Sequence, residues 1–126
     1  MLIKNLAIIA FLFLFSGFIA CTAGDSPFEG SWESISGTIR YKFYGSSYEA
    51  FSALEDDNGK HYYKGKFTYK EMFADRGVIR FKQTHSAAAK GAWKVDAADA
   101  AANYKIMSTN AIEISSTIYR KKVSFW

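Results

Sequence analysis

Cysteine and histidine, which often act as nucleophiles or metal ligands, are rare in this chain. It contains one cysteine, Cys21, and two histidines, His61 and His85. No Gly-x-Ser-x-Gly motif is present to place a serine nucleophile on a strained turn. His61 falls on the apolar face of its segment without a second clustered metal donor, which indicates a histidine of the core or rim. We therefore expect no catalytic residues, no metal site and no cofactor.

Two adjacent aspartates, Asp56 and Asp57, are the remaining candidates for cation binding. Calcium is bound by carboxylate oxygens, but the residue spacing of an EF-hand loop is absent. The two aspartates precede Asn58-Gly59, a dipeptide typical of tight hairpin turns. We therefore interpret them as part of a hairpin tip.

The chemistry of Cys21 depends on the segment that precedes it. A single positive charge, Lys4, is followed by an apolar run from Leu6 to Phe15, and small residues stand close to the cysteine. This order is typical of a secretory signal peptide. The end of the segment resembles the lipobox of bacterial lipoproteins, with Phe18 where Leu, Val or Ile is usual.

The lipobox resemblance implies a signal peptide over residues 1–20 and a lipid-modified Cys21 at the start of the mature chain. Thr22 rather than Asp follows the cysteine, and the resemblance therefore implies the outer membrane of the cell envelope. Two alternatives stay open. In the first, Leu6–Ala20 stays as an uncleaved membrane helix, although spanning needs about 20 apolar residues. An ordinary signal peptide would leave a soluble protein.

The part of the chain that follows residue 20 has the length of one domain. Lys4 is the only charged residue before Cys21, so 15 Lys and Arg remain against 12 Asp and Glu. No block of five like charges and no nucleic-acid-binding motif is present, so we expect no nucleic-acid partner. Aromatic residues make up 17% of the chain, and this composition favours β-strands.

Apolar and polar residues alternate with a period of two from Gly30 onward, which predicts β-strands. Residues 22–29 are small and polar and include Pro27, so with Cys21 we interpret residues 21–29 as a lipidated tether and 30–126 as the domain. Gly65 interrupts the clearest strand and predicts a bulge or a sharp bend. The predicted strands cover residues 30–35, 38–44, 47–55, 60–70, 77–84, 91–95, 103–107, 111–115 and 117–125.

Two connecting segments lack this alternation. Residues 71–76 are predicted as a connection with one helical turn, and residues 96–102 as a helical turn or a loop. Eight or nine short strands separated by frequent turns predict an all-β, antiparallel up-and-down barrel or a sandwich. We expect a small eight-stranded barrel.

Several short motifs resemble those of small lipocalin-like, calycin-type barrels in bacterial lipoproteins. They are Gly30-Ser31-Trp32, the aromatic hairpin with Tyr41, Phe43 and Tyr48, Lys64-Gly65-Lys66-Phe67-Thr68, and Tyr119-Arg120-Lys121. The chain is shorter than a full lipocalin and has no clear C-terminal helix. The resemblance implies a non-enzymatic, membrane-anchored protein that binds a small apolar or amphipathic ligand.

The resemblance also implies which side chains line the ligand site. The inward aromatic residues that we expect to form it are Trp32, Tyr41, Phe43, Tyr63, Phe67, Tyr69 and Phe81. Buried tyrosine hydroxyls need hydrogen-bond partners, so we expect a partly filled barrel with a small pocket at one mouth, lined by its three tyrosines.

The alternative is a protein-interaction module of the cell envelope with a filled barrel core. Such a module would be an assembly accessory, an inhibitor or a host-contact protein. Its partner, an envelope or host protein, would contact the loops and the aromatic residues of the opposite face, Tyr44, Phe51 and Tyr62.

Overall fold

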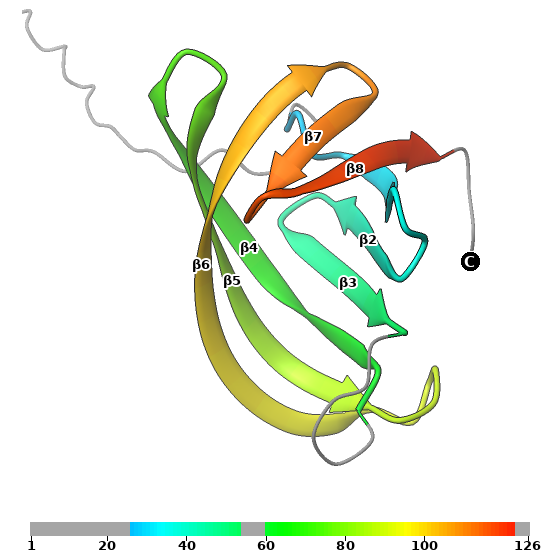
Figure 1. The fold of residues 1–126 in the computed structure, drawn as a ribbon. Helices are drawn as coiled ribbons and strands as arrows, with labels where there is room; N and C mark the ends of the chain where they lie inside the picture. Colours follow the sequence, from blue (N-terminus) through cyan, green and yellow to red (C-terminus); the bar gives the residue numbers. More distant parts are fainter. Residues whose placement is uncertain (1–25, 54–59, 123–126) are drawn as a thin grey trace, which may run out of the picture.

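The computed structural model describes residues 26–53 and 60–122, which form an all-β structure (Figure 1). Eight antiparallel strands follow one another around a barrel, which closes because β8 pairs with β1. This arrangement confirms the predicted eight-stranded up-and-down barrel. The strands are β1 (Gly30–Ser34), β2 (Ile39–Tyr44), β3 (Ser47–Ser52), β4 (Tyr62–Phe73), β5 (Arg76–Ala87), β6 (Lys94–Ser108), β7 (Ala111–Ile114) and β8 (Thr117–Lys122).

Because successive strands reverse direction, every second turn lies at the same end of the barrel. We call the end at which β1 begins the entry end. It also holds the β2–β3, β4–β5 and β6–β7 turns and the end of β8. The opposite end, which we call the far end, holds the other connections. Residues 26–29, which precede β1, therefore lie at the entry end.

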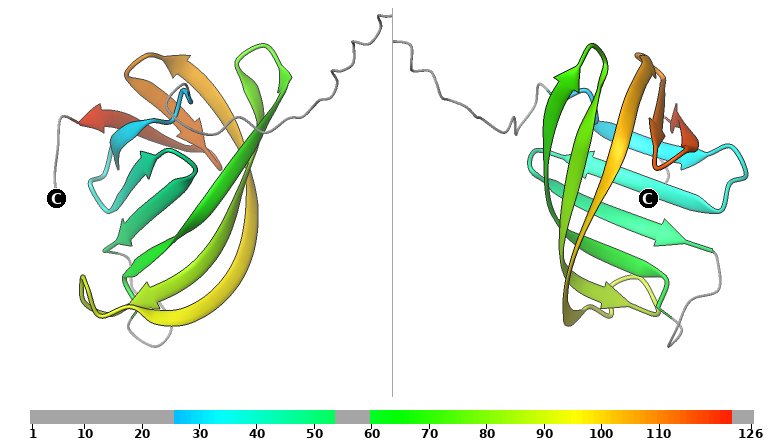
Figure 2. Two further views of the ribbon diagram at one scale, coloured as in Figure 1. Left: turned by 180° about the vertical axis from the view of Figure 1, so that it is seen from behind. Right: turned by 60° about the vertical axis from the view of Figure 1, so that its left-hand side comes forward.

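The strands differ greatly in length, and this makes the barrel asymmetric. Strands β4, β5 and β6 have 12, 12 and 15 residues, whereas the other five have between 4 and 6. Figure 2 shows the long strands extending beyond the short ones. Strand β7 pairs only with residues 104–108 of β6. The far half of β6 therefore has β5 on one side and no paired strand from the described residues on the other.

The alanine-rich segment corrects the sequence prediction. Residues 96–102 form neither a helical turn nor a loop, and β6 runs unbroken through them. Its pairing with β5 extends from Arg76↔Lys105 to Ser86↔Lys94. The ladder of backbone hydrogen bonds thus outweighs the low strand propensity of alanine. Residues 71–76 are likewise not a helical connection, because β4 continues to Phe73 and turns at once into β5.

Gly65 confirms the predicted bulge. The β4–β5 register shifts between Lys64 and Gly65, and a Cβ atom on Gly65 would collide with the backbone carbonyl of Lys82. Only glycine allows the two strands to approach so closely here. The shift bends the sheet, as closure into a barrel requires.

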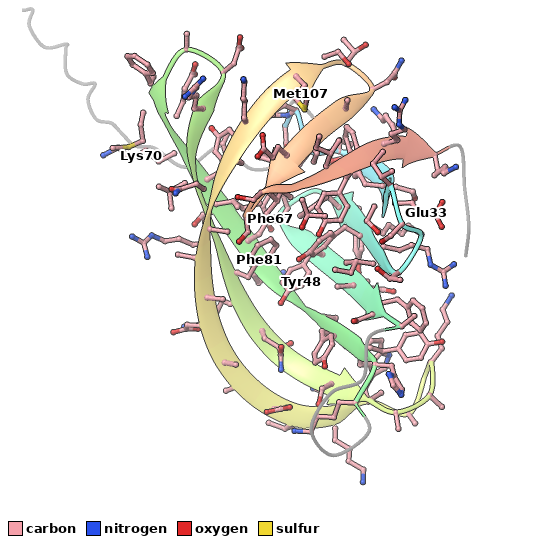
Figure 3. The ribbon with its side chains drawn as sticks, in the orientation of Figure 1. Glu33, Tyr48, Phe67, Lys70, Phe81 and Met107 are labelled. Atoms are coloured by element: carbon pink, nitrogen blue, oxygen red, sulfur yellow. The ribbon has the colours of Figure 1, made fainter. Side chains whose placement is uncertain are left out.

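The core lies between the long sheet and the short strands. Figure 3 shows Tyr48, Phe67 and Phe81 pointing into the barrel and Lys70 pointing away from it. Apolar burial of this kind is the main stabilising contribution to the fold. The buried cluster comprises Phe28, Trp32, Phe43, Tyr48, Phe67, Ile79, Phe81, Tyr104, Ile112, Ile114 and Tyr119.

Phe28 corrects the prediction of a tether over residues 21–29, of which 21–25 lie outside the described residues. Its side chain is 0% exposed. Its ring centroid lies 5.5 Å from that of Phe43 and 5.0 Å from that of Tyr104. Its carbonyl accepts a 2.8 Å hydrogen bond from the indole nitrogen of Trp32. The segment at residues 26–29 therefore packs as part of the domain and closes the entry end.

Candidate functional site

The interior of the barrel holds the seven aromatic residues that the sequence suggested as a ligand lining. Trp32, Phe43 and Phe67 are almost completely buried, and Phe81 is only 9% exposed. The Phe43 and Phe67 rings meet edge to face at 4.8 Å. These four side chains therefore belong to a packed core rather than to an accessible wall, and their proposed ligand contacts stay a prediction.

Tyr41 links this core to the middle of the barrel. Its ring stacks on Phe43 at 5.3 Å and on Phe81 at 5.6 Å, and the hydroxyl groups of Tyr41 and Tyr119 share a hydrogen bond. Burial raises the pKa of the Tyr41, Tyr48 and Tyr119 hydroxyls above the ordinary value. The three phenols are thus held neutral inside the barrel at physiological pH.

The other two tyrosines of the predicted mouth lie at different levels of β4. Tyr69 packs near the entry end, with its ring 5.1 Å from Phe28. Tyr63 lies toward the far end, where its hydroxyl donates a 3.0 Å hydrogen bond to the Lys60 carbonyl. Six residues of extended strand separate them by roughly 20 Å. The structure therefore does not bring Tyr41, Tyr63 and Tyr69 together at one mouth.

Along β2, β3 and β6, burial of the inward-facing side chains decreases from the entry end toward the far end. Ala100 pairs with Phe81 and Ala98 with Gln83 on the inner face of the sheet, yet both alanines are exposed. We call the half-buried and exposed inward positions of this half the far inner surface. It consists of Ile39, Tyr41, Ala50, Tyr63, Gln83, Ala98 and Ala100.

A cluster of polar side chains borders the far inner surface. The Ser86 hydroxyl donates a 2.6 Å hydrogen bond to the Asp96 carboxylate, and the ammonium group of Lys60 lies 3.0 Å from the same oxygen. These two donors hold the pKa of the Asp96 carboxyl below its usual value. The amide of Gln83 donates to the Asp96 carbonyl at 3.0 Å. The cluster fixes one carboxylate beside the interior of the barrel.

Two grooves lie along the long sheet. One, of about 410 Å³, is lined by residues 66–68, 80–82 and 99–101, whose outward positions include Lys66, Arg80, Lys82 and Asp99. The other, of about 760 Å³, lies where β6 and β7 separate. It is lined by residues 72–73, 76–78, 101–105, 113 and 115–116.

The outer face carries the aromatic residues that the alternative hypothesis singled out. The rings of Phe51 and Tyr62 lie 4.9 Å apart on neighbouring strands, and the Arg40 guanidinium lies 4.6 Å from the centre of the Phe51 ring. Tyr44 lies apart from them at the entry end, where its hydroxyl donates a 3.1 Å hydrogen bond to Glu49. Two of the three predicted contact residues therefore form one outward cluster.

The remaining candidates occupy separate positions. His61 is half-buried, and its Nδ1 lies 3.3 Å from the Ser52 carbonyl. The Nδ1 of His85 contacts the hydroxyl of Thr84, the preceding residue of β5. Within residues 26–53 and 60–122, no group of three or more His, Cys, Asp or Glu residues is placed to hold a metal. Cys21, Asp56 and Asp57 lie outside the described residues.

Across those same two ranges, no helix is long and apolar enough to cross a membrane. Comparison of the chain with protein-family models, with curated proteins and with solved structures found no match. A function for this chain must therefore be inferred from its own residues and their geometry.

Sequence reasoning missed three parts of this region. The burial of Phe28 was not predicted, because a single aromatic residue beside Pro27 shows no periodicity. The contact between Lys60 and Asp96 joins residues 36 positions apart in the sequence, and no local pattern predicts it. The exposed inner alanines had a signal, the concentration of alanine after residue 85, but that signal did not show which face each alanine occupies.

Proposed function

We propose that this protein is a lipid-anchored, non-enzymatic protein of the bacterial cell envelope, placed in the outer membrane, that binds a small apolar or amphipathic ligand on the far inner surface. The observation that carries the proposal is the exposure of Ala98 and Ala100 on the inner face of a barrel wall. Inward positions of a barrel are ordinarily covered by side chains or by a ligand. Alanine at both positions leaves room for the ligand.

The chemistry of the surface favours an amphipathic molecule. Apolar atoms of the ligand would contact Ala100 and the half-buried ring of Tyr41. A polar group would lie toward Lys60, Ser86 and Asp96, whose hydrogen bonds already surround one carboxylate. A mostly apolar wall with a few convergent polar groups is typical of small-molecule sites.

The test is a titration of the purified full-length protein, held in an amphipathic polymer, with a fluorescent fatty acid. We expect saturable binding and a change in tryptophan emission, because Trp32 packs inside the barrel.

Two matched variants locate the ligand. Ala100→Phe fills the far inner surface and should weaken binding at least about tenfold. Ala101→Phe places the same ring on the outward-facing neighbour and should leave binding nearly unchanged. Equal effects of the two variants, or no saturable binding by the parent protein, would exclude this site.

The outward cluster supports a second candidate function, docking of an envelope or host protein. Phe51, Tyr62 and Arg40 form a cation–aromatic cluster on the outer face, and aromatic residues and arginine are enriched at protein interfaces. Loss of partner capture from envelope extracts in Phe51→Ser, with fatty-acid binding retained, would favour this candidate.

A further inference from the structure

The far half of β6 lacks a neighbouring strand on one side. Strand β7 pairs with β6 only down to Tyr104, opposite Ile114. The chain then turns at Ser115 and Ser116, which both have positive φ, and starts β8. Residues 94–102 therefore pair with β5 alone among the described strands. At about 3.3 Å per residue, this open side is roughly 30 Å long.

The backbone hydrogen bonds identify which residues point to the open side. The Ser115 amide donates to the Asn103 carbonyl from the β7–β8 turn, whereas the Ile106 amide donates to Asp75 on the opposite side of β6. In an antiparallel strand the N–H and C=O groups of residues i and i+2 point to the same side. The backbone groups of Asp99 and Ala101 therefore point, like those of Asn103, toward the open side.

The side chains of this half of β6 leave both faces accessible. From Lys94 to Ala101 every side chain is exposed except that of Asp96, which is half-buried. A strand of a closed barrel ordinarily buries its inner face. The groove of about 760 Å³ adjoins the open side at Ala101, Asn103 and Ser115 and extends from there toward the β4–β5 turn.

We propose that the open side of β6 binds an extended polypeptide segment of another protein, which pairs antiparallel to β6 as an added strand. No described strand pairs with the N–H and C=O groups on this side of residues 94–102, and a row of such groups at strand spacing is complementary to another extended backbone. The added strand would continue the line of β7 toward the far end and complete the barrel wall.

The small side chains of β6 define the kind of segment. Side chains of the added strand that point inward would lie beside Ala98 and Ala100, where larger apolar residues fit. Those that point outward would lie beside Asp99 in solvent. The partner segment is therefore extended and alternates apolar with polar residues. A second folded copy fits less well, because the β7–β8 turn lies beside β6 at Asn103.

This proposal does not rest on the ligand proposed above, because it depends on backbone groups of β6. The probe is a synthetic peptide of alternating valine and threonine with a lysine at each end, and a version with central prolines serves as the control peptide. Added to the full-length protein, the valine–threonine peptide should bind saturably. It should slow hydrogen exchange of the Asp99 and Ala101 amides, while the proline version should not.

One pair of variants tests the backbone contact directly. Ala101→Pro removes an N–H that faces the open side, which an edge position tolerates, and should weaken peptide binding at least about tenfold. Ala101→Thr keeps the N–H and should bind like the parent protein. Fatty-acid binding by both variants tests the proposed ligand site separately. Thermal unfolding of both variants shows whether the fold is retained.

Three outcomes would overturn the inference. The first is the absence of saturable peptide binding. The second is protection of amides elsewhere than in residues 94–102. The third is protection of Asp99 and Ala101 that rises with protein concentration without peptide and accompanies dimerisation in sedimentation, which would make a second copy the occupant. If Ala101→Pro unfolds, the exchange of the parent protein's amides still decides the question.

Discussion

Phe28 is a single side chain outside the sheet that closes one end of the barrel. It contacts rings from β2, β4 and β6, because Phe43, Tyr69 and Tyr104 all pack against it. Its carbonyl accepts the hydrogen bond of the Trp32 indole, which is fully buried. Edge-to-face aromatic contacts of this kind stabilise a core beyond the burial of apolar area.

Replacing Phe28 by Ala should lower the free energy of unfolding by about 3–5 kcal/mol, because it leaves a cavity in a closed core. Phe73→Ala is the matched control, since Phe73 is 70% exposed at the β4–β5 turn and should change stability by less than about 0.5 kcal/mol. Chemical denaturation of both variants measures the difference. Similar losses would show that residues 26–29 do not close the barrel in solution.

Asp96 provides a pH-dependent contribution at the far end. The Ser86 and Lys60 contacts lower the pKa of its carboxyl in the folded state, so the ionised carboxylate favours folding. This contribution is fully present above the unfolded-state pKa of about 3.9. It is lost as the pH falls through the lower pKa of the folded state.

Asp96→Asn should therefore be less stable than the parent protein at neutral pH. The difference between the two should stay constant from pH 7 down to about pH 5 and then shrink as the solution becomes more acidic. Thermal unfolding at a series of pH values measures it. Asp99→Asn, at an exposed position without a described ion pair, is the control. A difference that grows in acid would contradict the assigned contacts.

At the scale of the element, β4 shows how alternation separates core from solvent. Phe67 is 2% exposed, whereas its neighbour Lys66 is exposed and reaches the Ser47 hydroxyl at 3.3 Å. The inner row meets Phe43 and Phe81, and the outer row carries lysines. The predicted inward face of this strand is therefore confirmed by the burial of Phe67.

Phe67→Ala should cost about 3–5 kcal/mol of unfolding free energy, as expected for a large buried ring. Lys66→Ala on the same strand should change it by less than about 0.5 kcal/mol. Urea denaturation followed by tryptophan fluorescence compares the two. The assignment of the inner face would be wrong if the lysine variant lost as much stability as the phenylalanine variant.

At the scale of the whole molecule, the first described residues lie at one end of the barrel. Ser26, the β4–β5 turn and the end of β8 share the entry end, and the exposed side chains of Met72 and Phe73 lie there too. The far inner surface and the open side of β6 extend toward the opposite end. If Cys21 carries a lipid, both proposed binding surfaces therefore lie away from the anchored end.

Cys21→Ala tests the anchor that the lipobox resemblance implies. We expect the variant to lose incorporation of radiolabelled fatty acid and to accumulate as an uncleaved precursor, because the modified sulfur is missing. Detergent phase separation of the parent protein should place it in the detergent phase. A parent protein without incorporated lipid that stays in the aqueous phase would contradict the lipoprotein hypothesis.

The sequence by itself determined the class of the fold and most of its strands. Regular alternation of apolar and polar residues in β2, β4 and β5 indicates strands with one buried face and one exposed face. Such a pattern can be recognised within a short stretch of sequence. Gly65 predicted its bulge because only the absence of a side chain permits that approach. The alternation also predicted aromatic residues of the core, because Trp32, Phe43 and Phe67 lie at inward positions of their strands.

Only the tertiary structure decided which parts of the barrel are filled and which are open. Alanine occurs on both faces of β6 and gives no periodic signal. The extent of β6 therefore depends on the pairing of this strand with β5. The contacts of Phe28 and of Asp96 join residues far apart in sequence, and chain folding alone creates them. The open side of β6 follows from the shortness of β7, because strand lengths are limited by the pairing available around a closed sheet.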